Sequence, residues 1–177
     1  MLLSAGADPN LRTGPPRKTA LQVAASAGSL SSLEMLVRAG ADWKATDDWG
    51  WRVQHEAAAS GKKEVIRWTF GRSISGHNDK DQLGRTPLLV ALMAGAREDA
   101  VEELLHQGAD PGPADYVGRT CPEAAILYCT PEVAKLVLTV SLGSLTDEVR
   151  KGLMDLARER DNDMQSTTVL ILGKKST

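Results

Sequence analysis

Short apolar segments with helical spacing recur along this chain in pairs. The first segment of each pair is rich in alanine, as in 23–25 and 56–59, and its small side chains and good helix propensity suit a closely packed inner helix. The second segment carries larger apolar residues at i, i+3 and i+4, which places them on one face of a helix. These stripes are Leu33, Leu36 and Val37; Val101, Leu104 and Leu105; and Val133, Leu136 and Val137. The pattern therefore predicts pairs of helices.

Capping residues indicate where several of these helices begin and end. Thr86 followed by Pro87 is typical of a helix start, because the hydroxyl can accept a bond from a free amide and proline lacks an N–H that would have no partner there. Thr130 followed by Pro131 repeats the signal. Glycine tolerates the left-handed conformation that often ends a helix. Predicted helix ends of this kind lie at Gly28, Gly40, Gly61, Gly95 and Gly108.

The chain is also similar to itself at a fixed spacing. Four segments, 18–28, 51–61, 85–95 and 119–129, align without gaps. Their second residues are spaced by 33, 34 and 34, and they are Thr19, Arg52, Thr86 and Thr120. A second marker, the sequence Gly-Ala-Asp, keeps the same period and ends at Asp8, Asp42 and Asp110. Two independent markers with one period indicate a stack of similar units.

These units resemble the ankyrin repeat, which has about 33 residues and a Thr-Pro-Leu-His signature. The resemblance covers most of the chain and implies an all-α ankyrin-repeat solenoid of helix-turn-helix units joined by hairpin-like loops. The sequence departs from the signature at 52–55, where Arg-Val-Gln-His stands, and 71–79 lacks the Gly-Ala-Asp marker. The first loop is one residue longer than the others and contains Pro15 and Pro16, so we expect it to be irregular.

The two ends of the chain differ from its centre. We assign residues 1–143 to ankyrin repeats, with a truncated first unit and then four units anchored at Thr19, Arg52, Thr86 and Thr120. Residues 1–8 match the end of a second helix, which favours a fragment, a shortened gene model or a chain that once continued N-terminally. Residues 144–177 show helical spacing after Thr146 and a break at 161–163. They are either a degenerate C-terminal capping repeat or an unrelated helical tail.

Charge and composition narrow the classes of partner. The 21 basic and 23 acidic residues nearly balance, so no long-range field favours nucleic acid or an anionic membrane. No segment approaches the roughly 20 apolar residues of a membrane-spanning helix. Cys121 and Cys129 are too few for a disulfide framework, and we expect reduced thiols that serve in packing. We therefore expect an intracellular protein, cytoplasmic or alternatively nuclear, that is a monomer or part of a longer chain.

The motifs that would support catalysis or metal binding are incomplete. A zinc-protease helix would need a second histidine where Ala59 stands, and a calcium loop would need oxygen ligands where Leu83 and Val90 stand. Residues 173–176 lack the glycine spacing of a phosphate-binding loop. His55 occupies the histidine position of the repeat signature and should form local hydrogen bonds. We predict no catalytic residue, no metal, no cofactor and no enzyme activity.

The ankyrin resemblance implies a binding surface made of the loop tips and the exposed face of the inner helices. The residues placed there are Trp49, Trp51, Leu83, Arg85, Tyr116, Arg119 and Tyr128. Tryptophan, tyrosine and arginine dominate the energetics of protein interfaces. The resemblance thus implies an unidentified protein or peptide partner. The alternative is a structural spacer, or a fragment of a larger ankyrin-containing protein whose activity lies outside this chain.

The four tryptophans account for most of the seven aromatic residues and need separate interpretations. Trp49 and Trp51 lie in a predicted loop, where each either contacts a partner or lies flat on the neighbouring loop and stabilises the stack. Trp43 follows a Gly-Ala-Asp marker, and Trp68 lies in a predicted second helix beside Ile66 and Phe70. We expect the latter two tryptophans to belong to the core.

Overall fold

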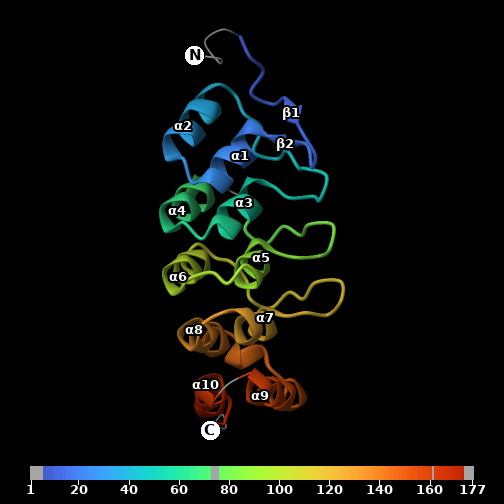
Figure 1. Ribbon diagram of the computed structural model, residues 1–177, viewed down its shortest axis with the longest axis vertical. Helices are drawn as coiled ribbons and strands as arrows, with labels where there is room; N and C mark the ends of the chain where they lie inside the picture. The colour runs from blue at the N-terminus through green and yellow to red at the C-terminus, as the bar shows by residue number, and fades with distance from the viewer. Residues whose placement is uncertain (1–5, 73–75, 161, 174–177) are drawn as a thin grey trace.

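The computed structural model describes residues 6–72, 76–160 and 162–173. Over these ranges the chain forms successive pairs of helices that stack along one long axis (Figure 1). The inner helices are α1 (Ala20–Ala27), α3 (Val53–Ser60), α5 (Pro87–Met93), α7 (Cys121–Tyr128) and α9 (Asp147–Arg160). The outer helices are α2 (Leu30–Arg38), α4 (Lys63–Arg72), α6 (Glu98–His106), α8 (Pro131–Ser141) and α10 (Asn162–Leu172). The stack confirms the predicted all-α solenoid.

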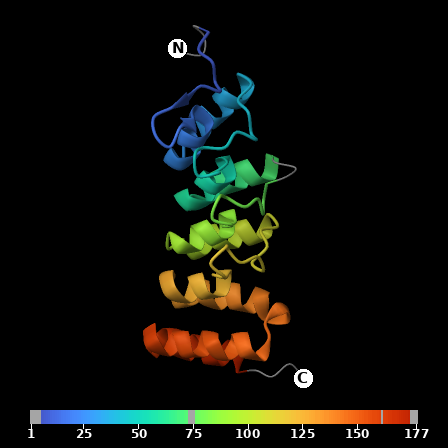
Figure 2. The ribbon, with the colours of Figure 1, turned by 90° about the vertical axis from the view of Figure 1, so that its right-hand side faces the viewer.

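Inner and outer helices form two columns, and each helix packs on its equivalent in the next pair. The contacts α1–α3, α3–α5, α5–α7 and α7–α9 make the inner column, and α2–α4, α4–α6, α6–α8 and α8–α10 make the outer one. Long loops, here called fingers 1 to 4, precede α1, α3, α5 and α7 in that order and extend from the side of the inner column that faces away from the outer helices (Figure 1). The view turned by 90° shows the same succession of layers (Figure 2). The fingers and the inner helices therefore share one face.

Finger 1 is the only described segment with strand structure, in β1 (Arg12–Thr13) and β2 (Lys18–Thr19). These short strands pair antiparallel, with Arg12 opposite Thr19. The turn between them holds the two prolines, and Arg17 has a positive φ of 55°. The irregular first loop that the sequence predicts is thus a minimal hairpin.

The capping residues lie where the sequence predicts them, although the hydroxyl of Thr130, which precedes α8, makes no capping bond. Thr19, Thr86 and Thr120 precede α1, α5 and α7, and each hydroxyl accepts a bond from the amide three residues later. Gly28 and Gly61 end α1 and α3 in the left-handed conformation, with φ of 73° and 62°. The helix boundaries therefore follow from local sequence.

The core runs between the two columns for the length of the stack. Alanines of the inner helices, such as Ala25 and Ala58, are fully buried, and so are Leu33, Val101 and Val133 of the outer stripes. Cys121 and Cys129 are buried free thiols, as expected. Burial raises the pKa of Cys121 to about 12 and that of Cys129 to about 11. Both thiols are thus protonated at neutral pH and act as packing groups.

The C-terminal pair continues the stack, with α9 beginning at Asp147 and packing on α7 while α10 packs on α8. Leu153, Ala157 and Met164 bury their side chains in the core, whereas Val169 and Leu170 are exposed. The segment between α8 and α9 forms a short 3₁₀ turn, η2 (Leu142–Ser144). Across the described residues, none of the helices is both long and apolar enough to span a bilayer.

Candidate partner-binding surface

A buried aspartate organises each of fingers 2, 3 and 4. Asp47, Asp81 and Asp115 are spaced by 34 residues, and the Oδ1 atom of each accepts bonds from the amides two and four residues later. The six distances lie between 2.8 and 3.1 Å. We did not predict this role, although the regular spacing of the three aspartates is visible in the sequence. These bonds fix the shape of each finger tip.

Backbone hydrogen bonds join each finger to the next. The amide of Asp48 donates to the carbonyl of Pro16, that of Gln82 to Trp49, and that of Tyr116 to Leu83, at 2.8 to 3.0 Å. Because every finger uses the same position for this bond, the tips form a regular row. Fingers 2, 3 and 4 each add one apolar side chain to this row, two residues after the aspartate. Their exposed fractions are 51% for Trp49, 57% for Leu83 and 81% for Val117.

Trp49 and Trp51 belong to one finger but have different environments. Trp49 is half exposed, and its ring meets the ring of Trp51 edge to face at 6.1 Å. Trp51 is less exposed, because its Nε1 atom donates to Oδ2 of Asp81 at 3.0 Å and its ring stacks on His55 at 6.0 Å. Trp51 thus links finger 2 to finger 3, while much of Trp49 faces solvent.

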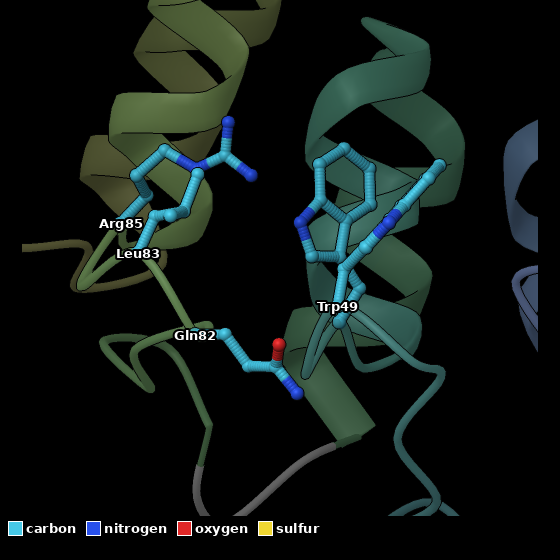
Figure 3. A pocket seen from close by; sticks show the side chains of 5 residues that line it. Trp49, Gln82, Leu83 and Arg85 are labelled. Carbon is cyan, nitrogen blue, oxygen red and sulfur yellow. The ribbon is translucent and has the colours of Figure 1, made fainter.

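A hollow of about 410 Å³ lies between fingers 2 and 3 (Figure 3). It is lined by Trp49, Trp51, Gln82, Leu83 and Arg85. We call it the finger hollow. Four of the seven residues predicted to bind a partner therefore come together in one concavity with both apolar and polar walls.

The cations around the finger hollow are already paired. Arg85 contacts Oδ2 of Asp81 at 2.7 Å, and Lys18 contacts Oε1 of buried Glu56 at 2.5 Å. Burial alone would raise the pKa of Asp81, but the Arg85 side chain and the amides of Arg85 and Leu83 hold that pKa below its ordinary value. Burial raises the pKa of Glu56 despite its bond to Lys18. The hollow thus offers fixed apolar walls and little uncompensated charge.

His55 ties the inner helix α3 to finger 3. Its Nδ1 atom accepts from the amide of Arg52 at 3.2 Å, so the neutral ring carries its proton on Nε2 and donates to the carbonyl of Arg85 at 3.2 Å. Burial lowers the pKa of His55 and keeps the ring neutral. In the preceding unit, Gln22 donates to the carbonyl of Trp51 at 2.6 Å in the same way. The local hydrogen bonds predicted for His55 are thus present, and one of them reaches the next finger.

The other three predicted residues, Tyr116, Arg119 and Tyr128, lie outside the finger hollow. Tyr116 is 72% exposed, and its ring covers Gly84, where an added Cβ would come within 2.7 Å of the ring. Arg119 donates from Nη1 to Sδ of Met93 at 3.4 Å. Tyr128 is exposed at the end of α7. The structure thus places these three along the same face but in the next unit.

Trp43 and Trp68 lie away from the fingers. Their rings stack with centroids 5.5 Å apart, and both are partly buried against the core. The guanidinium of Arg72 lies 4.9 Å from the Trp68 ring. This arrangement agrees with the core role that the sequence predicts. Among the described residues, no three His, Cys, Asp or Glu side chains are placed to hold a metal ion.

Comparison with protein families identifies the repeat. A model of ankyrin repeats (3 copies) matches residues 21–115 and 55–147. The matches together span most of the chain, which therefore belongs to the ankyrin-repeat family. A comparison with curated proteins finds no match. Ankyrin repeats are generally protein-interaction modules, and the family is typically non-enzymatic.

Proposed function

We propose that this chain is a non-enzymatic interaction module that binds a protein or peptide partner across its fingers and inner helices. The observation that carries the proposal is the finger hollow, where Trp49 and Leu83 are exposed on adjacent, hydrogen-bonded fingers. Exposed aromatic and aliphatic side chains beside a concavity are typical of interface hot spots. Of the predicted residues, Tyr116, Arg119 and Tyr128 would extend the contact into the next unit.

The walls of the finger hollow are held before any partner arrives. Trp51 and Arg85 both bond to Asp81, which also binds two amides of finger 3. A fixed surface loses little conformational freedom on association, so more of the contact energy appears as affinity. In this proposal Trp49 and Leu83 provide the anchors, while Trp51 and Arg85 both contact the partner and position the anchors.

Two further features support the wider proposal. The pair α9 and α10 stacks on α7 and α8, which supports a capping role for residues 144–177. Cys121 and Cys129 are free and buried, which is compatible with a reducing compartment. We therefore propose that the module acts in the cytoplasm or the nucleus, and that α9 and α10 close the C-terminal end of the repeats.

The test is an affinity pull-down with quantitative mass spectrometry using three versions of the chain. The first is wild type, and the second is the double variant Trp49→Ala, Leu83→Ala. The third is a matched control, Met35→Ala, Val140→Ala, which removes two equally exposed apolar side chains from outer helices. Trp51 stays in place because its bond to Asp81 is structural. Circular dichroism establishes that all three fold alike.

We expect at least one protein that wild type and control retain equally and that the finger variant loses by about tenfold or more, as hot-spot truncation implies. Identical profiles for all three versions would count against the finger hollow and favour the spacer alternative.

A further inference from the structure

Arg119 occupies the same repeat position as Arg85 but has no carboxylate partner among the residues that the structure describes. Each arginine lies four residues after the aspartate of its finger. Arg85 closes an ion pair with its own Asp81, whereas Asp115 binds only the amides of its finger among the contacts of the described residues. The guanidinium of Arg119 instead reaches the sulfur of Met93. Since thioether sulfur is a weak acceptor, most of the donor capacity of Arg119 stays available.

The neighbouring finger explains this difference. Next to Asp81 stands Trp51, which donates its indole N–H to that carboxylate and lies 5.8 Å from the Arg85 guanidinium. The equivalent neighbour of Asp115 is Arg85, whose side chain is already committed to Asp81. Finger 4 therefore lacks the aromatic wall that confines the arginine of finger 3.

Arg119 lines a second hollow of about 280 Å³, formed by finger 4, α7 and α9. Its walls are Val117, Gly118, Arg119, Glu123, Leu127 and Leu156. We call it the Arg119 hollow. Apart from Arg119 and Glu123, these side chains are apolar or absent.

Arg119 is the cation that lines this hollow, and the carboxylates near it are engaged by other groups. The nearby carboxylate of Glu123 is engaged in capping α7, because Oε2 accepts from the Thr120 amide at 2.7 Å and from its hydroxyl at 2.9 Å. Asp115 is buried beneath the finger and bonded to amides. Lys80 adds a second cation on this face, with Nζ 5.8 Å from the Tyr116 ring. Glu123 and Asp115 offset the charges of Arg119 and Lys80, so the attraction for an anion comes from the N–H donors of Arg119 that have no carboxylate partner among the described residues.

We propose that the Arg119 hollow binds an aspartate or glutamate side chain of the partner, with an apolar partner residue packed against Val117 and Leu127. This inference rests on the proposed function, since it assigns the chemistry of the partner segment that crosses the fingers. A planar guanidinium bonds a carboxylate through two parallel N–H groups. Exclusion of water by the apolar walls strengthens such a pair. The partner is therefore an acidic segment with apolar residues that fill both hollows.

A display selection with a random library of twelve-residue peptides tests this chemistry directly. Selections run in parallel on wild type, on Arg119→Gln and on Arg97→Gln. Arg97 precedes α6 and its side chain is 84% exposed, so the last variant controls for the loss of one positive charge. We expect peptides from wild type and Arg97→Gln to be enriched in aspartate or glutamate beside apolar residues. Arg119→Gln should lose the acidic enrichment and keep the apolar one.

A double-mutant cycle then locates the contact. One selected peptide is compared with its Asp→Asn or Glu→Gln form on wild type and on Arg119→Gln. Each single change should weaken binding by about tenfold, as a desolvated charged pair predicts, and the two changes together should cost little more than either one. If the losses of affinity from the two changes multiplied instead, the assignment of the carboxylate to Arg119 would be overturned.

The outcomes separate this inference from the proposed function. Binding of the selected peptides is also measured on the Trp49→Ala, Leu83→Ala variant. Peptides that need these two residues but show no acidic preference would overturn the Arg119 site and leave the finger hollow intact. Acidic enrichment that persists on Arg119→Gln would also overturn it. If no selected peptide depends on Trp49 or Leu83, the proposed function itself fails.

Discussion

Fingers 3 and 4 have the same framework but differ in how firmly the rest of the molecule holds them. In both, a buried aspartate binds two amides of the tip, and one backbone bond links the tip to the preceding finger. Finger 3 also accepts two side-chain hydrogen bonds from the preceding unit, from Trp51 to the Asp81 carboxylate and from His55 to the Arg85 carbonyl. The equivalent residues facing finger 4 are Arg85 and Leu89, which have no such bonds to it among the contacts of the described residues.

The comparison shows that a repeat position takes its role from the unit before it. Arg85 and Arg119 are identical residues at identical positions, yet the first forms an ion pair and the second forms none with the described part of the chain. Leu89 is fully buried and carries no polar atom on its side chain, so it cannot replace His55 as a donor to the next finger. The side chains of finger 3 are thus fixed by contacts within the protein, whereas in finger 4 the arginine remains available to a partner.

Removal of the buried aspartates should reveal the largest difference between the two fingers. Asp81→Ala leaves the Arg85 guanidinium, the Trp51 indole N–H and two amides without their acceptor, so we expect a loss of about 3 kcal/mol in unfolding free energy. Asp115→Ala removes only the amide bonds, for which about 1–2 kcal/mol is expected. Urea unfolding followed by circular dichroism measures both variants. Equal losses would mean that the side-chain network around Asp81 adds nothing.

Replacing His55 by the leucine found at the equivalent position before finger 4 should have the next largest effect on the unfolding free energy. His55→Leu copies Leu89 and removes the acceptor of the Arg52 amide and the donor to the Arg85 carbonyl, so we expect a loss of about 2 kcal/mol at neutral pH. Urea unfolding measures the loss, with His106→Gln as a control at the end of α6. A loss no greater than that of the control would show that His55 does not hold finger 3.

The same variant should also change the pH dependence of stability. Burial lowers the pKa of His55 in the folded chain, so the unfolded chain takes up this proton first as pH falls below about 6.5. The stability that neutral His55 contributes is complete above that value and is lost as pH falls towards the folded pKa. Wild type should therefore lose more stability than His55→Leu between pH of about 7.5 and 5. Parallel pH profiles would contradict the neutral, bonded ring.

Backbone dynamics should show the smallest of these differences. The amides of Leu83 and Arg85 should exchange with deuterium about tenfold more slowly than those of Val117 and Arg119, because opening finger 3 breaks the additional side-chain bonds. Mass spectrometry of exchanged peptides measures this ratio. In His55→Leu the ratio should shrink. Faster exchange in finger 3 than in finger 4 would reverse the comparison.

Much of the fold could be predicted from the sequence because the signals that specify it are local. The threonine caps, the glycines at helix ends and the apolar stripes act within one or two turns of helix, and their 33–34-residue period reports the stack. The binding surface was harder to predict. Four of the seven predicted residues line one hollow, while the family pattern could not separate Trp49 from Trp51 or foresee the second hollow, to which α9 contributes Leu156.

The sequence by itself determined that this chain is a stack of ankyrin repeats, since each unit carries its own caps, turns and apolar faces. Only the tertiary structure decided what the repeated positions do. The hydrogen bond from Trp51 to Asp81 forms because residues 30 positions apart meet between fingers, and Trp51 thereby flanks the ion pair that Arg85 makes with Asp81 inside finger 3. Arg119 contacts a methionine sulfur and no carboxylate of the described residues, because the corresponding contact between fingers 3 and 4 brings different side chains together. Repetition fixes the framework, and the contacts between neighbouring units fix the chemistry of its surface.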